Sequence, residues 1–422
     1  MSAIDASDAP DIPASRAAAA TGENPAARLM ELAEREGPVV ALPGGVTGVF
    51  DPELSLEVDK ANAEGLMVAE SLVDVLGLRR TEQPASWREV RAIVAEQSAR
   101  LATPEHLKAL HGRMRTFLAR GGGRETDLTR LVWECMSRTL IPCVIDDLDA
   151  DGYATLDAEQ QMRYRVQQNQ RISFRERISD FMLLRASTQV ITRHLKRRLR
   201  DGSSHEDYAQ ALLALADRIG VDRVTYLVTV QLIAISGVPG MMAACLLFAL
   251  HRYPEWHPRI AAEVEALEED ALYTLPMRRL PCTMRFIKEA MRMWTTPFVT
   301  RRVASREIVV GDLRVPEGQT YELSSYILHH SPRWWDDPDT FDPDRWLPER
   351  RQVVNGTYVP FGFAPRACAG PSLGHAQLVL YLATIVRDFD ATIAPHAQPW
   401  MRMDDGFAVP AGMFGTLVPR DW

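Results

Sequence analysis

Cys368 lies in a segment, residues 360–371, whose residue types suit a metal-binding thiolate. Glycines and prolines surround the cysteine, and the apolar run over residues 372–389 predicts a buried helix directly after it. Pro371 suits the first turn of that helix, because the N–H that proline lacks would have no helical partner there. The positive end of the helix would then point back at Cys368 and stabilise its thiolate, the form of cysteine that binds metal ions.

Two neighbours of the cysteine indicate which metal group would bind. Phe361 would shield the sulfur from water, and Arg366 offers a planar guanidinium for a carboxylate. A thiolate ligand of a heme iron needs this setting, with the arginine holding a heme propionate. Because a lone cysteine near glycines is usually structural, this interpretation depends on the rest of the chain.

The segment resembles the heme-ligand signature of the cytochrome P450 (heme-thiolate) family, Phe-Gly-x-Gly-x-Arg-x-Cys-x-Gly. The matching positions are Phe361, Gly362, Arg366, Cys368 and Gly370. Ala364 stands where the family usually has glycine, a departure that concerns the turn of the loop and not the ligand. The resemblance implies heme b with Cys368 as the axial ligand of its iron, and Phe361, Arg366 and Gly370 around it. No C-x-x-C-H motif occurs, so covalent attachment of the ring is not expected.

Two further elements precede the cysteine in the order that the family shows. Glu289 and Arg292 form a Glu-x-x-Arg pair that would share one helix face. The run at residues 341–346 matches the family's Phe-x-Pro-x-Arg-Trp and contains Arg345. The resemblance implies that Glu289, Arg292 and Arg345 form a buried charge network behind the cysteine loop, which maintains the fold and does no chemistry.

Other heme contacts follow from the same resemblance. Residues 111–115 match the family's His-x-Arg-x-Arg in a helix beneath the heme, so His111 and Arg115 are expected to bind propionates, since four residues apart on a helix they share a face. Arg302, in Arg-Val-Ala, matches a third propionate contact.

The long central helix expected at residues 224–250 departs from the family pattern. Relatives usually carry an acid and an alcohol there that relay protons, but this chain has Pro239 and Gly240, and neither can pass a proton through its side chain. Gly237 would leave room for oxygen, and Ser236 would partly substitute for the missing pair. The catalytic candidates on this helix are therefore Ser236, Gly237 and Gly240.

The expected substrate pocket is mostly apolar with few polar anchors, which suits an apolar small molecule. Its further candidates are Ile233, Thr295, Thr296, Phe298, and Met413 and Phe414 at the tip of a hairpin expected over residues 409–417.

Composition agrees with one large, mainly α domain that has small β-sheets, with heme buried between the central helix and the cysteine loop. The chain has 422 residues, of which 46% are hydrophobic, and a net charge of −8, which gives no support to nucleic-acid binding. Residues 1–25 predict a disordered tail and residues 26–422 the domain. Residues 38–50 and 300–325 predict short strands. The five scattered cysteines favour a reducing cytoplasm.

The apolar run at residues 224–250 is long enough to cross a bilayer, but its polar residues, glycines and proline favour a buried helix. No membrane anchor is therefore expected. Arg113, Arg120 and Arg124 are candidates for docking an acidic ferredoxin, which with its reductase would donate electrons. The basic run at residues 193–200 is interpreted as a solvated helix face.

Three functions remain open. The first is a monooxygenase that tailors a natural product, with protons supplied by water or a substrate hydroxyl. The second is an atypical heme-thiolate reaction, such as oxidative coupling, cyclisation, peroxide use or rearrangement. The third is a heme-binding protein without catalysis.

Overall fold

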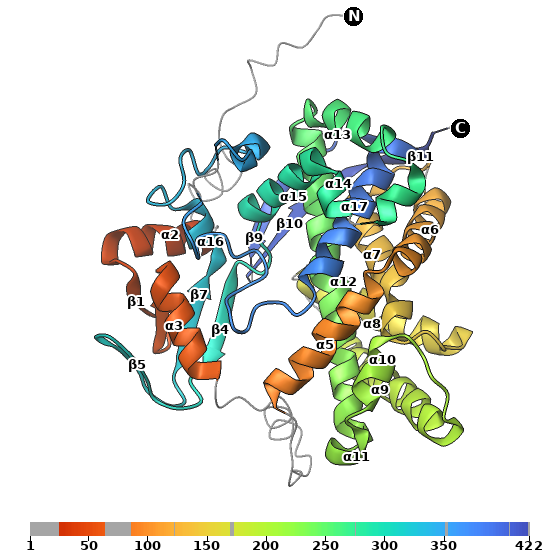
Figure 1. The fold of residues 1–422 in the computed structure, drawn as a ribbon, viewed down its shortest axis with the longest axis horizontal. Helices are drawn as coiled ribbons and strands as arrows, with labels where there is room; N and C mark the ends of the chain where they lie inside the picture. Colours follow the sequence, from red (N-terminus) through yellow and green to blue (C-terminus); the bar gives the residue numbers. More distant parts are fainter. Residues whose placement is uncertain are drawn as a thin grey trace, which may run out of the picture.

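The computed structural model describes residues 25–63, 86–121, 123–168, 173–274, 276–350, 353–404 and 406–420. Helices dominate these residues and the strands form small sheets, so the expected fold class is confirmed (Figure 1). The tail expected at residues 1–25 lies outside the described residues except for Pro25.

A body of helices fills one side of the molecule (Figure 1). Side-chain caps define several helix starts: the Ser86 hydroxyl accepts from the Glu89 N–H, and Ser173 and Glu176 form a capping box. The helices of the body are α5 (Trp87–Leu101), α6 (Pro104–Gly121), α7 (Leu128–Val144), α8 (Ala150–Gln167), α9 (Phe174–Asp201), α10 (Tyr208–Leu213), α11 (Ala216–Ile219), α12 (Val221–Arg252), α13 (Trp256–Glu265), α14 (Pro276–Arg279), α15 (Pro281–Met293) and α17 (Pro371–Asp388), with a 3₁₀ turn η2 (Glu269–Tyr273).

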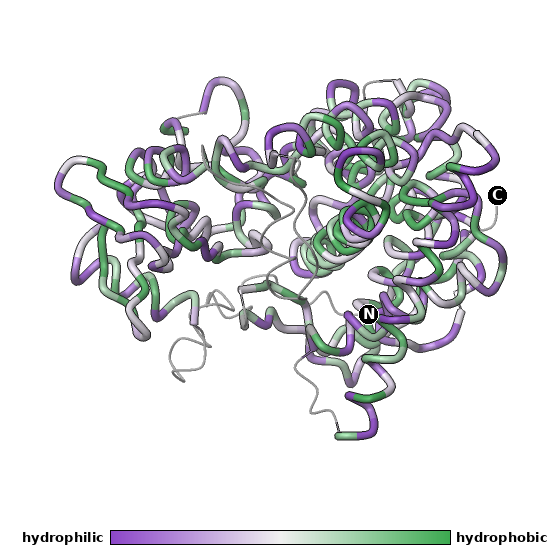
Figure 2. Tube along the Cα trace, turned by 90° about the horizontal axis from the view of Figure 1, so that it is seen from below, coloured by the Kyte–Doolittle hydropathy of each residue, from purple (hydrophilic) through white to green (hydrophobic). Residues whose placement is uncertain are grey.

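α12 is the central element of this body. It packs against α7, α9, α10 and α17, and its burial accounts for its continuous apolar sequence. By length and composition alone it could span a membrane, yet 72% of its most apolar window is buried inside the protein. Figure 2 shows apolar segments gathered inside the helical body and hydrophilic segments along its outside. The interpretation of this run as a buried helix therefore agrees with the structure.

A four-stranded sheet lies on the other side, in the order β1 (Val39–Leu42), β2 (Val46–Val49), β7 (Thr320–Ser324) and β4 (Val299–Val303) (Figure 1). β2 and β7 run parallel, and the other neighbours are antiparallel. β5 (Ile308–Val310) and β6 (Leu313–Val315) form a separate hairpin. These strands fall where the sequence predicts them. α2 (Pro25–Glu36), α3 (Pro52–Ala63) and α16 (Ser325–His330) complete this part, while the 3₁₀ turn η3 (Pro343–Trp346) packs against α15.

The C-terminal strands pair differently from the prediction. β10 (Phe407–Ala411) pairs with β9 (Trp400–Asp404), while β11 (Phe414–Pro419) lies between β3 (Thr126–Asp127) and β8 (Phe389–Ile393). The hairpin expected over residues 409–417 is therefore wrong. Gly412, at φ +70°, lies where a Cβ would come within 2.6 Å of the Gln398 carbonyl oxygen, so the chain turns there from one sheet into the other.

Candidate active site

The cysteine loop, residues 359–370, leads directly into α17. The Cys368 N–H donates to the Phe361 carbonyl at 2.7 Å, and the Gly370 N–H lies 3.3 Å from the Cys368 sulfur. Pro371 is the first residue of α17, as predicted. A Cβ at Gly370 would lie 2.9 Å from the Ser98 hydroxyl oxygen on α5, so glycine permits the close approach of loop and helix. The loop thereby presents an exposed sulfur at the N-terminus of a buried helix.

Cys368 opens onto a cavity of about 740 Å³ between the loop, α5, α12 and β4. The wall from α12 is formed by Leu227, Val230, Gln231, Ala234, Ile235, Val238 and Pro239. These positions recur at the spacing of one helix face, and Gln231 is the only polar side chain among them. Phe361, Val299 and Phe407 add apolar surface elsewhere on the wall.

Two guanidiniums give this cavity a positive end. Arg302 and Arg366 both line it. The Nε of Arg302 lies 3.5 Å from the buried Asp59 carboxylate and has no hydrogen-bond partner among the described residues. Burial, and then the charge of Arg302, lower the pKa of Arg366. Half-buried cations with incomplete pairing suit a ligand that brings carboxylates.

Trp87 and Arg91 belong to the site although no motif of the sequence indicates them. Both line the cavity from the first turns of α5. Arg91 donates to the carbonyls of Ala367 and Cys368, at 3.0 and 3.2 Å, and so ties α5 to the cysteine loop. The guanidinium of Arg366 lies 6.0 Å from the centre of the Trp87 ring. The signal in the sequence is a tryptophan and an arginine four residues apart, and therefore on one helix face.

The structure places His111 and Arg115 elsewhere, which corrects their expected role. Both ring nitrogens of His111 are used inside the core, at 2.9 Å from the hydroxyl oxygens of Tyr273 and Thr384. Arg115 pairs with Asp388 at 2.7 Å. Neither residue lines the cavity, so neither is retained as a cofactor ligand.

The catalytic candidates on α12 point away from the cavity. Ser236 donates to the Gln160 side chain of α8 at 2.6 Å, and a Cβ at Gly240 would meet the Trp133 ring at 2.6 Å. Gly237 is buried and also lies off the cavity wall. The structure therefore places Ser236, Gly237 and Gly240 off the cavity wall, because the face of α12 that bears them packs against α7 and α8.

The predicted substrate residues divide in the same way. Thr296 lines the cavity, and Thr295 lines a smaller neighbouring cavity of about 60 Å³ that Pro239 and Phe361 also border. Ile233, Phe298, Met413 and Phe414 lie off the wall, with Phe298 and Met413 in the core and Phe414 on the surface. Phe407, from the start of β10, takes the place expected for the hairpin tip.

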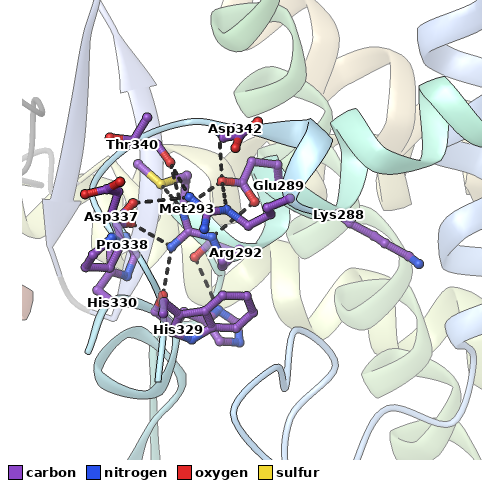
Figure 3. Close-up of polar contacts among 12 residues, drawn as sticks. Lys288, Glu289, Arg292, Met293, His329, His330, Asp337, Pro338, Thr340 and Asp342 are labelled. Carbon is purple, nitrogen blue, oxygen red and sulfur yellow. Dashed lines mark hydrogen bonds and ion pairs between the residues drawn. The ribbon is translucent and has the colours of Figure 1, made fainter. Parts of the chain in front are cut away.

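Behind the cysteine loop, the structure brings Glu289, Arg292 and Arg345 together, and Figure 3 shows Glu289 beside Arg292. The Glu289 carboxylate accepts from Arg292 at 2.8 Å and from Arg345 at 3.0 Å, and both Glu289 and Arg292 are fully buried. The Trp346 indole and the Asp342 N–H also donate to this carboxylate, at 2.9 and 3.0 Å. Arg292 further donates to the carbonyls of His329, Pro338 and Thr340. The charges are thus paired and the hydrogen-bonding groups are used.

The proposed docking arginines are not equivalent. Arg113 is half-buried and donates from Nε to the Thr139 carbonyl at 3.0 Å. Arg120 and Arg124 are exposed.

Comparison with known proteins gives this site a family. The model of the cytochrome P450 family matches residues 167–417, and the chain belongs to that family. Cyclooctatin synthase of Streptomyces melanosporofaciens is 37% identical over 33% of this chain and 30% of its own length. Cyclooctat-9-en-7-ol 5-monooxygenase of the same organism is 30% identical over 47% and 44%. These matches thus cover less than half of either relative. The crystal structure of the cytochrome P450DA heme domain shares the fold, with a TM-score of 0.71, 19% identity and coverage of 94% and 92%.

The family binds heme b, and the described residues fit this group. A cysteine sulfur is exposed to a largely apolar cavity, as an iron ligand must be. At the same cavity the buried Nε of Arg302 has no hydrogen-bond partner among the described residues, and Arg366 is a second guanidinium, so both could hold propionates. Arg91 and Trp87 complete the wall beside them.

Proposed function

We propose that this protein is a heme-thiolate oxidoreductase, and specifically a monooxygenase that tailors a small, mostly apolar natural product. The observation that carries the proposal is the exposed Cys368 sulfur on the apolar cavity beneath α12, with Arg302 and Arg366 at the same cavity. Heme b, when bound, supplies the iron and the redox chemistry. The chain would supply the sulfur of Cys368 as iron ligand, Arg302 and Arg366 as propionate contacts, and an apolar wall that keeps water from the substrate.

The cavity wall supports the apolar substrate class. The α12 face offers one amide, Gln231, among aliphatic side chains, and the side chain is 8% exposed. A buried amide recognises a single hydroxyl or carbonyl on an otherwise apolar molecule. Cyclooctat-9-en-7-ol, after which one relative is named, is a compound of this kind. We therefore assign Gln231 the role of a substrate anchor.

Because α12 has Pro239 and Gly240 where relatives have an acid and an alcohol, protons must reach the site by another route. Pro239 lines the cavity and has no N–H, so the carbonyl of Ile235 lacks its helical donor. A water held at this carbonyl oxygen, or a hydroxyl of the substrate, would move protons there. The same feature favours the second candidate, an atypical reaction such as coupling, cyclisation or rearrangement that needs no relay.

Two experiments test the proposal. The reduced carbon monoxide complex should show the red-shifted Soret band of thiolate ligation, and Cys368→Ala should lose it. Turnover should then need dioxygen and an electron donor. Product formed without dioxygen, or with peroxide alone, would favour the atypical reaction. Substrate binding without turnover under any of these conditions would favour a non-catalytic heme protein.

We further propose that Arg120 and Arg124 bind an acidic ferredoxin that donates electrons. We also propose a cytoplasmic location for the protein. Both arginines are exposed, so they can meet a partner without rearrangement. Arg113 is not retained, since its side chain serves the contact between α6 and α7. Reduction through such a surface slows as salt concentration rises.

A further inference from the structure

His329 lies at the end of α16 and is fully buried, with both ring nitrogens in hydrogen bonds. Nδ1 lies 3.2 Å from the Arg292 carbonyl oxygen, and the Val359 N–H donates to Nε2 at 2.8 Å. A carbonyl can only accept and a backbone N–H can only donate. Nδ1 must therefore carry the proton and Nε2 must be bare, so the geometry specifies one neutral tautomer.

These two bonds connect the buried charge network to the cysteine loop. Arg292 belongs to the network, and Val359 stands two residues before Phe361. The Phe361 carbonyl in turn accepts from the Cys368 N–H at 2.7 Å, and the Gly362 N–H donates to the Val359 carbonyl at 2.9 Å. A continuous series of backbone and imidazole contacts thus runs from Arg292 to Cys368.

The surroundings keep the imidazole in this state. Arg292 donates to the His329 carbonyl at 2.8 Å, so a guanidinium lies beside the ring, as Figure 3 shows. Burial and this charge lower the pKa of His329 to about 3. Tyr358 lies 5.4 Å from the ring between centroids, and burial raises its pKa, so it remains neutral.

We propose that His329 is a positioning residue for Cys368, whose unprotonated Nε2 holds the entrance of the cysteine loop in register with the Glu289–Arg292 network. The proposal rests on the axial role of Cys368 proposed above. It assigns His329 no contact with the cofactor or the substrate, because His329 does not line the cavity.

His330 provides a matched control. It is also buried, and its Nδ1 contacts the Tyr326 carbonyl within its own helix at 3.1 Å. Its ring stacks on Tyr326 at 4.0 Å. It thus shares the burial and the helix of His329, while the Val359 N–H is bound by His329 alone among the described residues.

The test uses the heme-loaded protein and its His329→Gln, His329→Asn and His330→Asn variants. Glutamine can place an oxygen near the position of Nε2 and accept from Val359, whereas asparagine reaches only the position of Nδ1. Amide hydrogen exchange at Val359 should rise about tenfold in His329→Asn, as expected for one lost buried hydrogen bond, and remain within about threefold in His329→Gln. His330→Asn should leave it unchanged.

The second readout is the fraction of the reduced carbon monoxide complex that shows the thiolate Soret band. This fraction should fall in His329→Asn and be largely restored in His329→Gln. Unchanged exchange at Val359 in His329→Asn, or an equal effect in His330→Asn, would overturn the proposal. Faster exchange at Val359 with an undiminished thiolate band would also overturn it, because Cys368 would then be held independently. Failure of the axial role itself shows separately, as a thiolate band that survives Cys368→Ala.

Discussion

Beside the cysteine loop, the buried carboxylate of Glu289 pairs with the guanidiniums of Arg292 and Arg345, and these three residues are called here the Glu289 group. Near the start of α10, by contrast, one buried guanidinium pairs with three carboxylates. The second group, called here the Arg198 cluster, comprises Arg198, Asp146, Asp147, His205 and Asp207. Arg198 contacts Asp207 at 2.6 Å, Asp147 at 2.7 Å and Asp146 at 3.3 Å, and its side chain is fully buried. His205 lies 2.7 Å from Asp146.

The two groups differ in what they hold. The Glu289 group uses its remaining donors on backbone carbonyls that lead towards the cysteine loop. In the Arg198 cluster, Asp207 caps α10 and accepts from the Asp146 N–H, so it joins α9, α10 and the end of α7. Asp146, His205 and Asp207 lie close enough to hold a cation, but the guanidinium of Arg198 already supplies the positive charge. Both groups are buried ion pairs, but the Glu289 group supports the cysteine loop, whereas the Arg198 cluster only joins helices. The hydrogen bonds that each group makes to its surroundings account for this difference.

Replacing Glu289 with alanine should have the largest effect. Two arginines would remain in the interior without their carboxylate, at a cost of roughly 3–5 kcal/mol in folding free energy. We expect little soluble, heme-loaded protein, measured as heme per chain. Glu322→Ala is the control, because this buried carboxylate pairs with the mostly exposed Arg301. Normal heme content with only slower turnover would contradict a structural role for Glu289.

Arg198→Met should destabilise the fold without emptying the heme site. The carboxylates of Asp147 and Asp207 would lose their shared partner, for a loss of roughly 3 kcal/mol, measured as the midpoint of urea unfolding. Heme content per folded chain should not change. Arg197→Met serves as control, since this more exposed side chain contacts only Asp147 of the cluster. If Arg198→Met lost heme in proportion to its loss of stability, the Arg198 cluster would support the heme site just as the Glu289 group does.

Asp147 in the Arg198 cluster and His329 beside Arg292 should respond to different ranges of acid pH. Burial raises the pKa of Asp147, but hydrogen bonds from Arg198 and Arg197 outweigh it and hold the pKa below its usual range. Its contribution to stability is therefore lost only as the pH falls below about 4. His329 has a pKa of about 3 when folded, so the unfolded chain takes up its proton first, and stability falls as the pH drops below about 6.5.

Each such histidine contributes a slope of up to about 1.4 kcal/mol per pH unit. His330, whose pKa burial also lowers, and His375, at about 4, act in the same range. We expect His329→Gln to reduce the slope of unfolding free energy between pH 6 and 5, and Arg197→Met to leave it unchanged. Urea titrations over this pH range measure the slope for each variant. An unaltered slope in His329→Gln would show that the His329 imidazole of the unmodified protein is protonated in the folded state.

The smallest effect is expected at Ser236. Ser236→Ala should leave turnover and its coupling to product unchanged, because the hydroxyl faces Gln160 behind α12, and should cost about 1 kcal/mol in stability. The comparison variant is Gln231→Leu, on the cavity face, which should weaken binding of an oxygenated substrate more than of its hydrocarbon parent. Increased peroxide release by Ser236→Ala would show that this serine takes part in proton delivery.

The contrast between these groups also shows what the sequence could predict. The Glu289 group and the cysteine loop are encoded in short motifs, so their members are recognisable from the sequence alone. The interpretation of the basic run at residues 193–200 as a solvated face is wrong for Arg198. On α9, Ile191, His194, Leu195 and Arg198 recur at helical spacing and point inwards, but Asp207 is the partner that stabilises Arg198 in the interior, and nothing in the run indicates it.

The orientation of α12 could not be predicted for a related reason. Its residues are apolar around the whole circumference, so no polar stripe distinguishes the face that meets the cavity from the face that meets Trp133. His111 is similarly ambiguous, because a histidine that bonds to two core hydroxyls and one that meets a cofactor have the same local sequence.

Arg302 and Arg366 have a consequence for binding of the cofactor. Four arginines line this cavity, and Arg302 and Arg366 are close enough for the charge of Arg302 to lower the pKa of Arg366, while Asp59 lies beside Arg302. A dianionic ligand between Arg302 and Arg366 would reduce their repulsion, so binding of the cofactor is expected to stabilise this wall. A porphyrin whose carboxylates are esterified would leave the repulsion in place.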